Sequence, residues 1–505
     1  MIDFTPLMRK SMRNRLEEQV RYKEHADSVQ QEQLVSLIEH AALTEFGRHY
    51  DFSAVRTYRQ FADTVPLHHY EDLRGQIMRM VRGEADVLWR GVTRNFAQSS
   101  GTSGGKSKYI PITADSFRLN HYRGSADVVA HYLNLNPRSR IMSGKGLILG
   151  GSFANELDLK PGVRVGDLSA NLIDNINPVV NLFRVPSKKI ALMEDWKQKL
   201  PAIIRASAAE NVTNLSGVPS WFLAVLRGVM EYRGVECIHD VWPNLEVFFH
   251  GGIAFEPYRK QYESFCDMSK MHFLDTYNAS EGFFAVQSDW STTAMLLLLD
   301  VGIFYEFIPV ENSGDESPVA LPAWEVETGR TYELVITACN GLWRYRIGDT
   351  VKVQSVKPLK ITIAGRTQSF INAFGEELMV HNAEYAVEHA AAATGASVLN
   401  YTAAPVFAAD GRKAHHQWIF EFEREPADMA VFVRVLDEKL KQVNSDYEAK
   451  RGGDIFLDAP QVVVARRGVF DDWLAKTGKL GGQRKVPRLA NNRLIADAIL
   501  ELNAV

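Results

Sequence analysis

The chain has 505 residues, 46% of them hydrophobic and 23% charged, and a formal net charge of -4. This length exceeds what one compact core accommodates, so we expect a globular protein of two or more domains. The small net charge gives no electrostatic reason to expect nucleic acid or an anionic membrane as a partner. The three cysteines show no metal-ligand or disulfide spacing, which fits a reducing cytoplasm.

No targeting or membrane segment is expected. The N-terminal segment Met1–Gln19 lacks the apolar stretch of a signal peptide. The longest apolar run, Ala294–Leu299, ends at Asp300 and is too short to span a bilayer. We therefore expect a cytoplasmic protein without a membrane span, and we expect a monomer.

Residues 1–83 predict helices, and Leu34–Ala42 has the spacing of an amphipathic helix. Pro66 and Gly83 interrupt the helical pattern. No chemistry-bearing motif occurs in this region, so we expect its helices to cover a core.

The segment Ser99–Lys108, SSGTSGGKSK, combines small hydroxyl residues, glycines and lysines. Glycines let the backbone approach a ligand closely, and successive N–H groups can form a nest for phosphate oxygens. Hydroxyls add donors and lysines add charge, so this composition favours a polyanion site. A flexible surface linker is the alternative, but the strand-like Tyr109–Ile112 follows at once.

A Walker A loop does not fit this segment. The spacing from Gly101 to Gly105-Lys106-Ser107 is one residue short of the Walker pattern. The segment also leads into an extended stretch, whereas a Walker loop opens a helix.

The next region alternates helices and strands. Its predicted elements are a helix over Asp115–Leu135 capped by Thr113, a strand at Gly146–Gly151, a helix over Trp196–Asn211, a strand and turn at Val212–Pro219, and a helix over Ser220–Tyr232. Residues 155–185 predict no regular element. The alternation indicates a doubly wound, parallel-rich sheet, in which ligands bind beyond the carboxyl ends of the strands.

Two strand-end loops carry candidate ligand groups. In Phe248–Gly252 the pair Gly251 and Gly252 would let a flat group lie against the backbone, but a simple turn is the favoured interpretation of these residues taken alone. His250 receives no role, because a lone histidine is usually structural.

The second loop follows a short strand within Phe273–Gly282. Tyr277 offers an aromatic face for stacking. Ser280 offers a hydroxyl, and Glu281 offers a hard oxygen ligand of the kind that suits Mg²⁺.

Met295–Val310 and Thr331–Ala338 predict further strands, with a polar loop over Glu311–Glu327 between them. Asp349 follows a glycine in Tyr345–Asp349, and a carboxylate there suits vicinal ribose hydroxyls. An Asx turn between strands is the alternative.

Ile361–Arg366 predicts a strand that ends in an arginine, and by itself it fits an ordinary strand and turn with a surface arginine. The string Ser369–Leu378 after it resembles the hinge region of an enzyme superfamily, and this resemblance implies a domain boundary there. The expected domains are therefore residues 1–366 and 367–505. The second predicts a small α+β unit: helices over His381–Thr394, Ala427–Lys450 and Phe470–Lys476, and strands over Ser397–Ala408, His416–Glu423 and Gln461–Ala465. A glycine-led basic loop at Gly481–Leu489 carries Lys485, and a solvated basic tail is its other interpretation.

Several of these strings, taken in chain order from Phe96 to Arg488, resemble the motifs of adenylate-forming enzymes. The Ser-Ser-Gly-Thr-Ser form at Ser99–Ser103 is most similar to the Gretchen Hagen auxin-responsive family of acyl acid amido synthetases, and we expect a bacterial member. Tyr277–Glu281 resembles the family's Tyr-Gly-x-Ser/Thr-Glu motif, with Asn278 in place of glycine.

Three later strings extend the resemblance. Tyr345–Asp349 resembles Tyr-Arg-x-Gly-Asp, Ser369–Leu378 resembles the hinge region, and Gln483–Arg488 resembles Gln-x-Lys-x-Pro-Arg. The resemblance implies an α/β fold, with a large N-terminal domain of parallel-rich sheets flanked by helices and a small mobile α+β C-terminal domain that turns near Ser369.

The resemblance also implies a role for each motif residue. The residues implied to bind the leaving phosphates are Ser99, Ser100, Gly101, Thr102, Ser103 and Lys108. The adenine pocket is implied to contain Gly251, Gly252 and Tyr277, and Ser280 is implied to contact the α-phosphate. By the same resemblance Glu281 binds Mg²⁺, Asp349 binds the ribose, Arg366 contacts ribose or phosphate, and Lys485 is catalytic.

The implied reaction is ATP-dependent ligation that forms a carbon–nitrogen bond. A small carboxylic acid becomes an acyl-adenylate with release of pyrophosphate, and an amino acid or other amine then takes the acyl group. An acyl-CoA-type thioester ligase is an alternative, since no residue excludes a thiol acceptor. A non-catalytic nucleotide-binding protein is disfavoured, because Glu281 and Lys485 are both present.

The acyl pocket is expected among Asp115–Arg140, Ile148–Phe153 and Val212–Phe222. One helix face there presents Phe117, His121, Tyr122 and Ser125. Core packing is favoured over pocket lining for this face, and no pattern identifies the acid.

Overall fold

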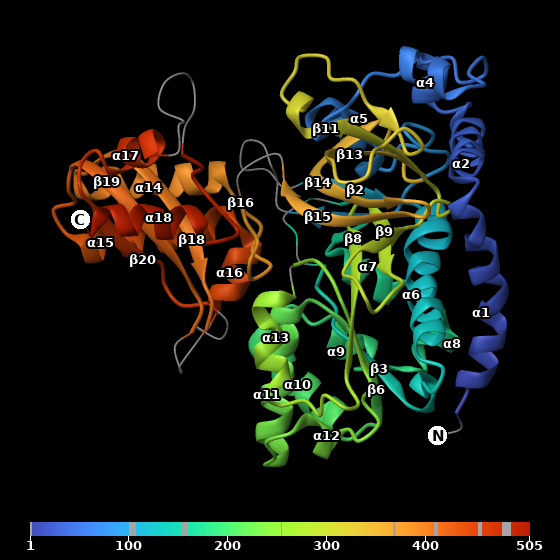
Figure 1. Cartoon of the computed structure of the whole chain (residues 1–505), viewed down its shortest axis with the longest axis horizontal. Helices are drawn as coiled ribbons and strands as arrows, with labels where there is room; N and C mark the ends of the chain where they lie inside the picture. Colours follow the sequence, from blue (N-terminus) through green and yellow to red (C-terminus); the bar gives the residue numbers. More distant parts are fainter. Residues whose placement is uncertain are drawn as a thin grey trace. The chain divides into compact units, whose positions relative to one another are not determined.

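The computed structural model describes residues 3–99, 108–153, 155, 157, 159–253, 255–366, 370–408, 413–452, 457–476 and 486–504. Contacts within the chain divide it into two units (Figure 1). Of the described residues, the first unit contains 3–99 and those from 108 to 366, and the second contains those from 370 to 504. Within the described residues, no helix is long and apolar enough to cross a membrane.

The first unit begins with helices, as the sequence predicts. They are α1 (Thr5–Gln19), η1 (Val20–Lys23), α2 (Ala26–Ala41), α3 (Glu45–His49), α4 (Tyr58–Thr64) and α5 (Tyr70–Val81). α1 runs beside α6 (Tyr122–Leu135) in Figure 1. Arg15 Nη2 in α1 donates to Asp127 Oδ2 in α6 at 2.7 Å and to Asp300 Oδ1 at 2.6 Å, so a largely buried arginine holds α1 against α6 and the turn at Asp300.

A small sheet holds both ends of the predicted phosphate loop. Its strands are ordered β2-β1-β4, namely β2 (Lys108–Ile112), β1 (Asn95–Ser99) and β4 (Arg164–Gly166). β1 and β2 are antiparallel, and Ser99 lies opposite Lys108. The segment therefore joins two strands, which confirms that it does not belong to a Walker A arrangement.

The predicted helix over Asp115–Leu135 is confirmed, but its first part is a π-helix, η2 (Ser116–His121), which continues into α6. Thr113 Oγ1 accepts a hydrogen bond from the Ser116 N–H at 3.0 Å, as expected for a cap.

Residues 155–185 were expected to be irregular, and this prediction is wrong. The region contains β4, α7 (Leu168–Asp174), α8 (Pro178–Asn181) and β5 (Arg184–Val185). These elements are too short to show a period, and the strands form only because β4 pairs with β1 and β5 pairs with β3.

The second sheet of this unit has twelve strands in the order β12-β11-β13-β14-β15-β10-β9-β8-β7-β6-β3-β5. The strands not yet given are β3 (Lys145–Ile148), β6 (Val212–Gly217), β7 (Val247–His250), β8 (His272–Ala279), β9 (Gly282–Gln287), β10 (Met295–Leu297), β11 (Ile303–Pro309), β12 (Leu321–Pro322), β13 (Thr331–Ala338), β14 (Tyr345–Val356) and β15 (Leu359–Arg366). The expected α/β fold is confirmed. Parallel pairing is confined to β5-β3-β6-β7-β8, and the remaining pairs are antiparallel, so the sheet is mixed.

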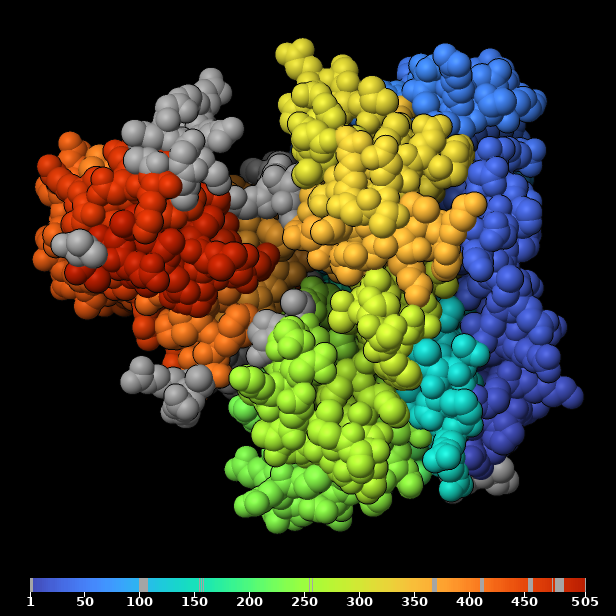
Figure 2. Space-filling model, viewed as in Figure 1, coloured from blue at the N-terminus to red at the C-terminus, as the bar shows by residue number. Residues whose placement is uncertain are grey.

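Helices connect the parallel strands, as the alternating pattern predicts. They are α9 (Lys188–Ala191), α10 (Trp196–Ala208), α11 (Pro219–Arg233), α12 (Ile238–Val241) and α13 (Glu256–Glu263), and short 3-10 turns occur at η3 (Ile141–Ser143) and η4 (Val310–Asn312). In the surface view, residues near 300–330 (yellow) lie against those near 45–65 (blue) (Figure 2). Tyr58 and Phe304 provide one contact there, with ring centroids 5.5 Å apart.

A buried ion pair holds the same contact together. Arg344 Nη2 lies 2.8 Å from Glu306 Oε1, and the side chains are 8% and 0% exposed. Arg344 Nη1 also donates to the carbonyls of Ala62 and Val65 at 2.8 and 2.7 Å. The pair thus joins β11, the start of β14 and the end of α4.

We expect Glu306→Gln to lower the free energy of unfolding of the first unit by about 3 kcal/mol or more, because the substitution leaves the buried Arg344 charge without its partner. Urea denaturation followed by tryptophan fluorescence measures the change. Glu327→Gln is the matched control, because Glu327 is exposed and lies 3.7 Å from Arg330; its expected effect is below about 0.5 kcal/mol. Equal effects of the two variants would contradict the role of the buried pair.

The second unit is a small α+β fold, as predicted. Its elements are β16 (Phe370–Ile371), β17 (Leu378–Met379), α14 (Val380–Thr394), β18 (Ser397–Val406), β19 (His415–Arg424), α15 (Met429–Val443), α16 (Ser445–Arg451), β20 (Gln461–Ala465), α17 (Val469–Lys476) and α18 (Leu494–Asn503). The single helix expected over Ala427–Lys450 is wrong: α15 ends before Asn444, whose side chain accepts from the Tyr447 N–H at 2.7 Å and starts α16.

Candidate functional site

The candidate site lies at the carboxyl edge of the parallel strands. Ile148 of β3 lies opposite Ser216 of β6, and Gly217 of β6 lies opposite His250 of β7. His250 in turn lies opposite Asp275 of β8. The segments that follow β3, β6, β7 and β8 therefore leave one edge of the sheet, where open α/β sheets bind their ligands.

The glycine pair after β7 is required by the local backbone. A Cβ atom on Gly251 would lie 2.6 Å from the Thr276 carbonyl oxygen and 2.7 Å from its Oγ1. Gly252 has φ +80°, which favours glycine. Bare backbone is thus left at this edge, beside the predicted adenine position.

His250, which received no functional role, is buried and stacks on Phe255 with ring centroids 4.3 Å apart. Its Nδ1 lies 3.1 Å from Asp275 Oδ1. These contacts are those of a packing residue.

The predicted loop over Tyr277–Gly282 is instead a tight hairpin. β8 continues to Ala279, which pairs with Gly282 of β9, so Ser280 and Glu281 form the turn. The small residues Asn278 and Ala279 indicate a loop locally, but they become strand because they pair with the fully buried β9. Glu281 is 9% exposed, and its carbonyl accepts from Asn340 Nδ2 at 3.1 Å.

Tyr277 and Asp349, expected to contact adenine and ribose, meet directly. The Tyr277 hydroxyl donates to Asp349 Oδ2 at 2.6 Å, and both side chains are buried. In the strand order, β9, β10 and β15 separate β8 from β14. The two residues are in contact although their strands are not neighbours in the sheet and their positions are far apart in the sequence, so the sheet must curve between these strands.

Asp349 has a second predicted site residue as its neighbour. It lies opposite Arg366 in the register of β14 with β15. Gly348 directly before it has φ +88°. Asp349 therefore follows a glycine with positive φ inside β14, and it does not lie in an Asx turn between strands.

The described end of the predicted phosphate loop points into the unit. Lys108 is 8% exposed, and its Nζ lies 3.4 Å from the Tyr345 hydroxyl and 5.7 Å from the ring centroid of Tyr70. Ser99 is described as the last residue of β1. The other residues predicted for this loop and for the hinge and catalytic loop lie outside the described residues: Ser100, Gly101, Thr102, Ser103, Ser369 and Lys485.

The helix face considered for the acyl pocket is largely packed. Phe117 and Tyr122 stack with centroids 5.6 Å apart, and the Tyr122 hydroxyl donates to the Leu172 carbonyl at 2.9 Å. Ser125 Oγ donates to the His121 carbonyl at 2.7 Å. Burial lowers the pKa of His121 to about 4, and its Nε2 has no hydrogen-bond partner within the described part of the chain.

Sequence reasoning missed a polar cluster behind the segment that follows β3. Lys199 Nζ donates to the carbonyls of Gly150 and Gly151 at 2.6 and 3.0 Å. Asp167 Oδ2 accepts from the Ser152 N–H at 2.6 Å. Burial lowers the pKa of Lys199 to about 8, opposed by the charge of Asp167. Lys199 stands in an ordinary helical pattern, so no sequence signal marks it.

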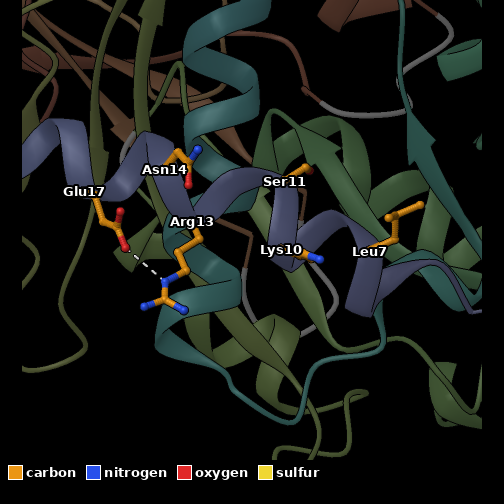
Figure 3. A pocket seen from close by; sticks show the side chains of 6 residues that line it. All are labelled: Leu7, Lys10, Ser11, Arg13, Asn14 and Glu17. Atoms are coloured by element: carbon orange, nitrogen blue, oxygen red, sulfur yellow. Dashed lines mark hydrogen bonds and ion pairs between the residues drawn. The ribbon is translucent and has the colours of Figure 1, made fainter.

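A surface depression on α1 is no comparable site. Leu7, Lys10, Ser11, Arg13, Asn14 and Glu17 line it (Figure 3). All come from one helix, and Arg13 Nε pairs with Glu17 Oε1 at 3.0 Å on the exposed surface. Elsewhere in the described ranges, no group of three or more His, Cys, Asp or Glu side chains could hold a metal ion.

Comparisons with known proteins match the chain along most of its length. The model of the GH3 family N-terminal domain matches residues 15–179 and 154–271, that of the central domain matches 296–366, and that of the C-terminal domain matches 381–494.

Among curated proteins, "Indole-3-acetic acid-amido synthetase GH3.4" of Arabidopsis thaliana is 23% identical, over 92% of this chain and 89% of its own. "Jasmonoyl--L-amino acid synthetase GH3.5" of Oryza sativa subsp. japonica is 26% identical, over 65% and 68%.

Among solved structures, AtGH3.15 acyl acid amido synthetase in complex with 2,4-DB has a TM-score of 0.62 at 19% identity, covering 98% of this chain and 96% of that chain. 2-Hydroxyisobutyryl-CoA ligase in the thioesterification state has a TM-score of 0.58 at 13% identity, covering 95% and 93%. At these identities the two structures establish a shared fold.

Proposed function

The chain belongs to the GH3 family, and from this membership we propose that it is an ATP-dependent acyl acid amido synthetase. The observation that carries the proposal is the contact between Tyr277 and Asp349, which unites two separately predicted nucleotide residues at a sheet edge suited to ligands. The names of the relatives, an indole-3-acetic acid-amido synthetase and a jasmonoyl–amino acid synthetase, support the same reaction class.

In the first step, a carboxylate oxygen of the acid attacks the α-phosphorus of ATP, a new oxygen–phosphorus bond forms, and the bond to pyrophosphate breaks. The barrier is mainly one of positioning and charge, as in other phosphoryl-type transfers. We assign the leaving phosphates to Ser99, to the loop residues Ser100–Ser103 and to Lys108. Ser280 donates to the α-phosphate, and Lys485 neutralises charge as the acid attacks.

Nucleotide recognition falls to the groups around Tyr277. The ring of Tyr277 and the backbone of Gly251 and Gly252 hold adenine in this proposal. Asp349 accepts hydrogen bonds from the ribose hydroxyls, and Arg366 contacts ribose or phosphate. The closeness of Asp349 to Arg366 in the strand register supports this assignment.

Glu281 would hold Mg²⁺, whose charge would offset that of the phosphates. Its carboxylate is a hard oxygen ligand, and Mg²⁺ in nucleotide sites takes only one or two carboxylates beside the phosphates. The position of Glu281 at the hairpin turn, on the same edge as Gly251, fits this use.

In the second step, an amine attacks the acyl carbon of the mixed anhydride. A carbon–nitrogen bond forms, the bond from acyl carbon to AMP oxygen breaks, and the amine loses a proton. We propose an amino acid as the amine, by analogy with the named relatives.

We further propose the following organisation. Residues 1–366 bind ATP and the acid, and residues 367–505 form a mobile lid that carries Lys485 and turns near Ser369 between the two steps. We also propose a monomer in a bacterial cytoplasm; the low identity to the plant relatives, 23% for the Arabidopsis protein, is compatible with a distant source.

Pyrophosphate release tests the function. The protein is incubated with ATP, Mg²⁺ and each of a panel of carboxylic acids, with and without pooled amino acids or coenzyme A. Release that requires an acid and accelerates with amino acids is expected. Release that no acid stimulates, in a protein that binds ATP, would contradict the proposal.

A thioester ligase is the second candidate, because the fold is shared with 2-hydroxyisobutyryl-CoA ligase. In the same experiment, acceleration by coenzyme A rather than by amino acids would favour it. Mass spectrometry of the product then distinguishes a thioester from an amide.

Tyr277→Phe should raise the KM for ATP by about tenfold with little change in kcat. The substitution keeps the ring but removes the hydroxyl that holds the Asp349 carboxylate, and a hydrogen bond to a charged group is worth roughly this factor. Initial rates of pyrophosphate release measure both constants. The analogue 2′,3′-dideoxy-ATP lacks the two ribose hydroxyls that Asp349 would bind. Its KM should therefore be the same in Tyr277→Phe and in the original protein.

Tyr305→Phe is the control, since it removes another buried hydroxyl from the same sheet. It should leave the KM for both nucleotides unchanged. If Tyr277→Phe weakened ATP and the dideoxy analogue equally, the hydroxyl would not act through Asp349.

A further inference from the structure

The segment Gly150–Ser152, which leaves the carboxyl end of β3, is held from behind by hydrogen bonds. Lys199 on α10 donates to the carbonyls of Gly150 and Gly151. The Gly151 N–H donates to Ser169 Oγ at 2.9 Å, and the Ser152 N–H donates to Asp167 Oδ2 at 2.6 Å. The Ser152 carbonyl accepts from the Asp167 N–H at 2.9 Å.

These hydrogen bonds leave few backbone groups of Gly150–Ser152 available to a ligand. The carbonyls of all three residues and two of their N–H groups are engaged by partners on α10 or at the start of α7. A backbone group that already has a hydrogen-bond partner gains little from a second one, so Gly150 and Gly151, which have no side chains, present a mainly apolar surface, and Ser152 adds one hydroxyl. A Cβ atom on Gly150 would lie 2.7 Å from Ile173 Cδ1 and 2.8 Å from the Ala191 carbonyl oxygen, so there is no room for a side chain at this position.

The segment leaves the same edge of the sheet as the strand that leads to the proposed adenylation site. β3 and β8 are three strand spacings apart in the sheet, or about 14 Å. Both end at the same edge, β8 in the Ser280–Glu281 turn. A small acid joined to the α-phosphate at Ser280 would extend along this edge toward β3.

On the basis of the proposed function, we propose that Gly150–Ser152 forms one wall of the acid site, here called the acid wall, and that Lys199 is the positioning residue that holds it. The substrate class follows from the engaged backbone of the two glycines: carboxylic acids with an aliphatic or aromatic body and no polar group on the side that meets Gly150 and Gly151.

Lys199 also makes the wall sensitive to pH. Asp167 is the charged group that faces it, and burial outweighs that attraction, which places the pKa of Lys199 at about 8. Above this pH the ammonium loses its charge, and its bonds to the two carbonyls weaken. The KM for the acid should therefore rise above about pH 8, while the KM for ATP does not.

Lys199→Met tests the positioning role in the adenylation step alone. We expect the KM for a favoured acid to rise about tenfold or more, since two charge-assisted hydrogen bonds are lost, with the KM for ATP within about twofold of the original. The rise of the acid KM between pH 7 and 9 should disappear in this variant, and Lys199→Arg should restore part of the affinity at both pH values.

Lys145→Met is the matched control. Lys145 stands at the amino end of the same strand, and its Nζ lies 2.6 Å from Glu210 Oε1 in a partly buried ion pair. It should change neither KM. Equal rises in the KM for acid and for ATP in Lys199→Met, or an unchanged acid KM, would overturn the proposal.

Hydrogen exchange gives a readout that does not depend on activity. In the unliganded protein, the amides of Gly151 and Ser152 should exchange about tenfold faster in Lys199→Met than in the original protein, and β6 and β7 should not change. Unchanged exchange would overturn the role of Lys199, whether or not the chain is a synthetase. Absence of acid-dependent pyrophosphate release would instead contradict the proposed function. If Lys199→Met did not fold, exchange of the same amides in the original protein at pH 7 and 9, corrected for intrinsic rates, decides the matter.

Discussion

Lys485→Ala is expected to lower the rate of acid-dependent pyrophosphate release by about 10²–10³-fold, the largest effect predicted for any single substitution in this chain. The reason is electrostatic. A lysine charge placed against the α-phosphate stabilises the transition state, and removing one such group commonly costs this factor in kcat. The KM for ATP should change much less, because the charge acts mainly in the transition state.

The second half-reaction separates this role from a general defect. When the variant is given synthetic acyl-adenylate and amine, amide formation should remain within about threefold of the original rate, because no phosphate is then attacked. Lys476→Ala is the control, since Lys476 is an exposed residue at the end of α17 in the same unit. Pyrophosphate release that is undiminished in Lys485→Ala would remove Lys485 from the mechanism.

Glu281→Gln should reduce adenylation by about 10²-fold and raise the Mg²⁺ concentration needed for half-maximal rate. The substitution keeps the shape of the side chain at the β8–β9 turn but removes its charge, and a neutral amide is a poorer Mg²⁺ ligand than a carboxylate. Mg²⁺ titration of the rate of pyrophosphate release measures the shift, and a tenfold excess of metal should recover part of the activity.

Glu231→Gln, on the exposed face of α11, is the matched control and should leave the Mg²⁺ titration unchanged. Thermal unfolding of Glu281→Gln without ligands shows whether the turn itself is affected. A normal Mg²⁺ titration in a folded Glu281→Gln variant would exclude Glu281 as the metal ligand.

Some local structure was predictable because contiguous residues determine it. Thr113 accepts from the Ser116 N–H and begins a helix at the expected position. The helices over Asp115–Leu135, Trp196–Asn211 and Ser220–Tyr232 and the strand from Val212 were predictable for a similar reason, since each is long enough to show its own pattern, and their alternation indicated a parallel-rich sheet.

Local composition misled where pairing with distant residues decides the outcome. Asn278 and Ala279 have the composition of a loop but form strand because β9 pairs with them. The strands β4 and β5 were not predicted, because each is too short to show an alternation of apolar and polar residues. They form by pairing with β1 and β3, which lie elsewhere in the chain. The break at Asn444 depends on a single side chain that caps the next helix.

The order of short motifs along the chain was enough to predict the kind of chemistry: the hydroxyl and glycine loop, the Ser280–Glu281 pair, the Asp349 carboxylate and Lys485. Each motif alone has an ordinary structural interpretation, and it is their succession that favours an adenylate-forming enzyme. Which residues meet could be seen only in the folded chain. The Tyr277–Asp349 contact joins positions 72 residues apart, and the Lys199–Gly150 contact joins positions 49 residues apart. Such contacts arise from the order and curvature of the strands, and no local period of helix or strand encodes them.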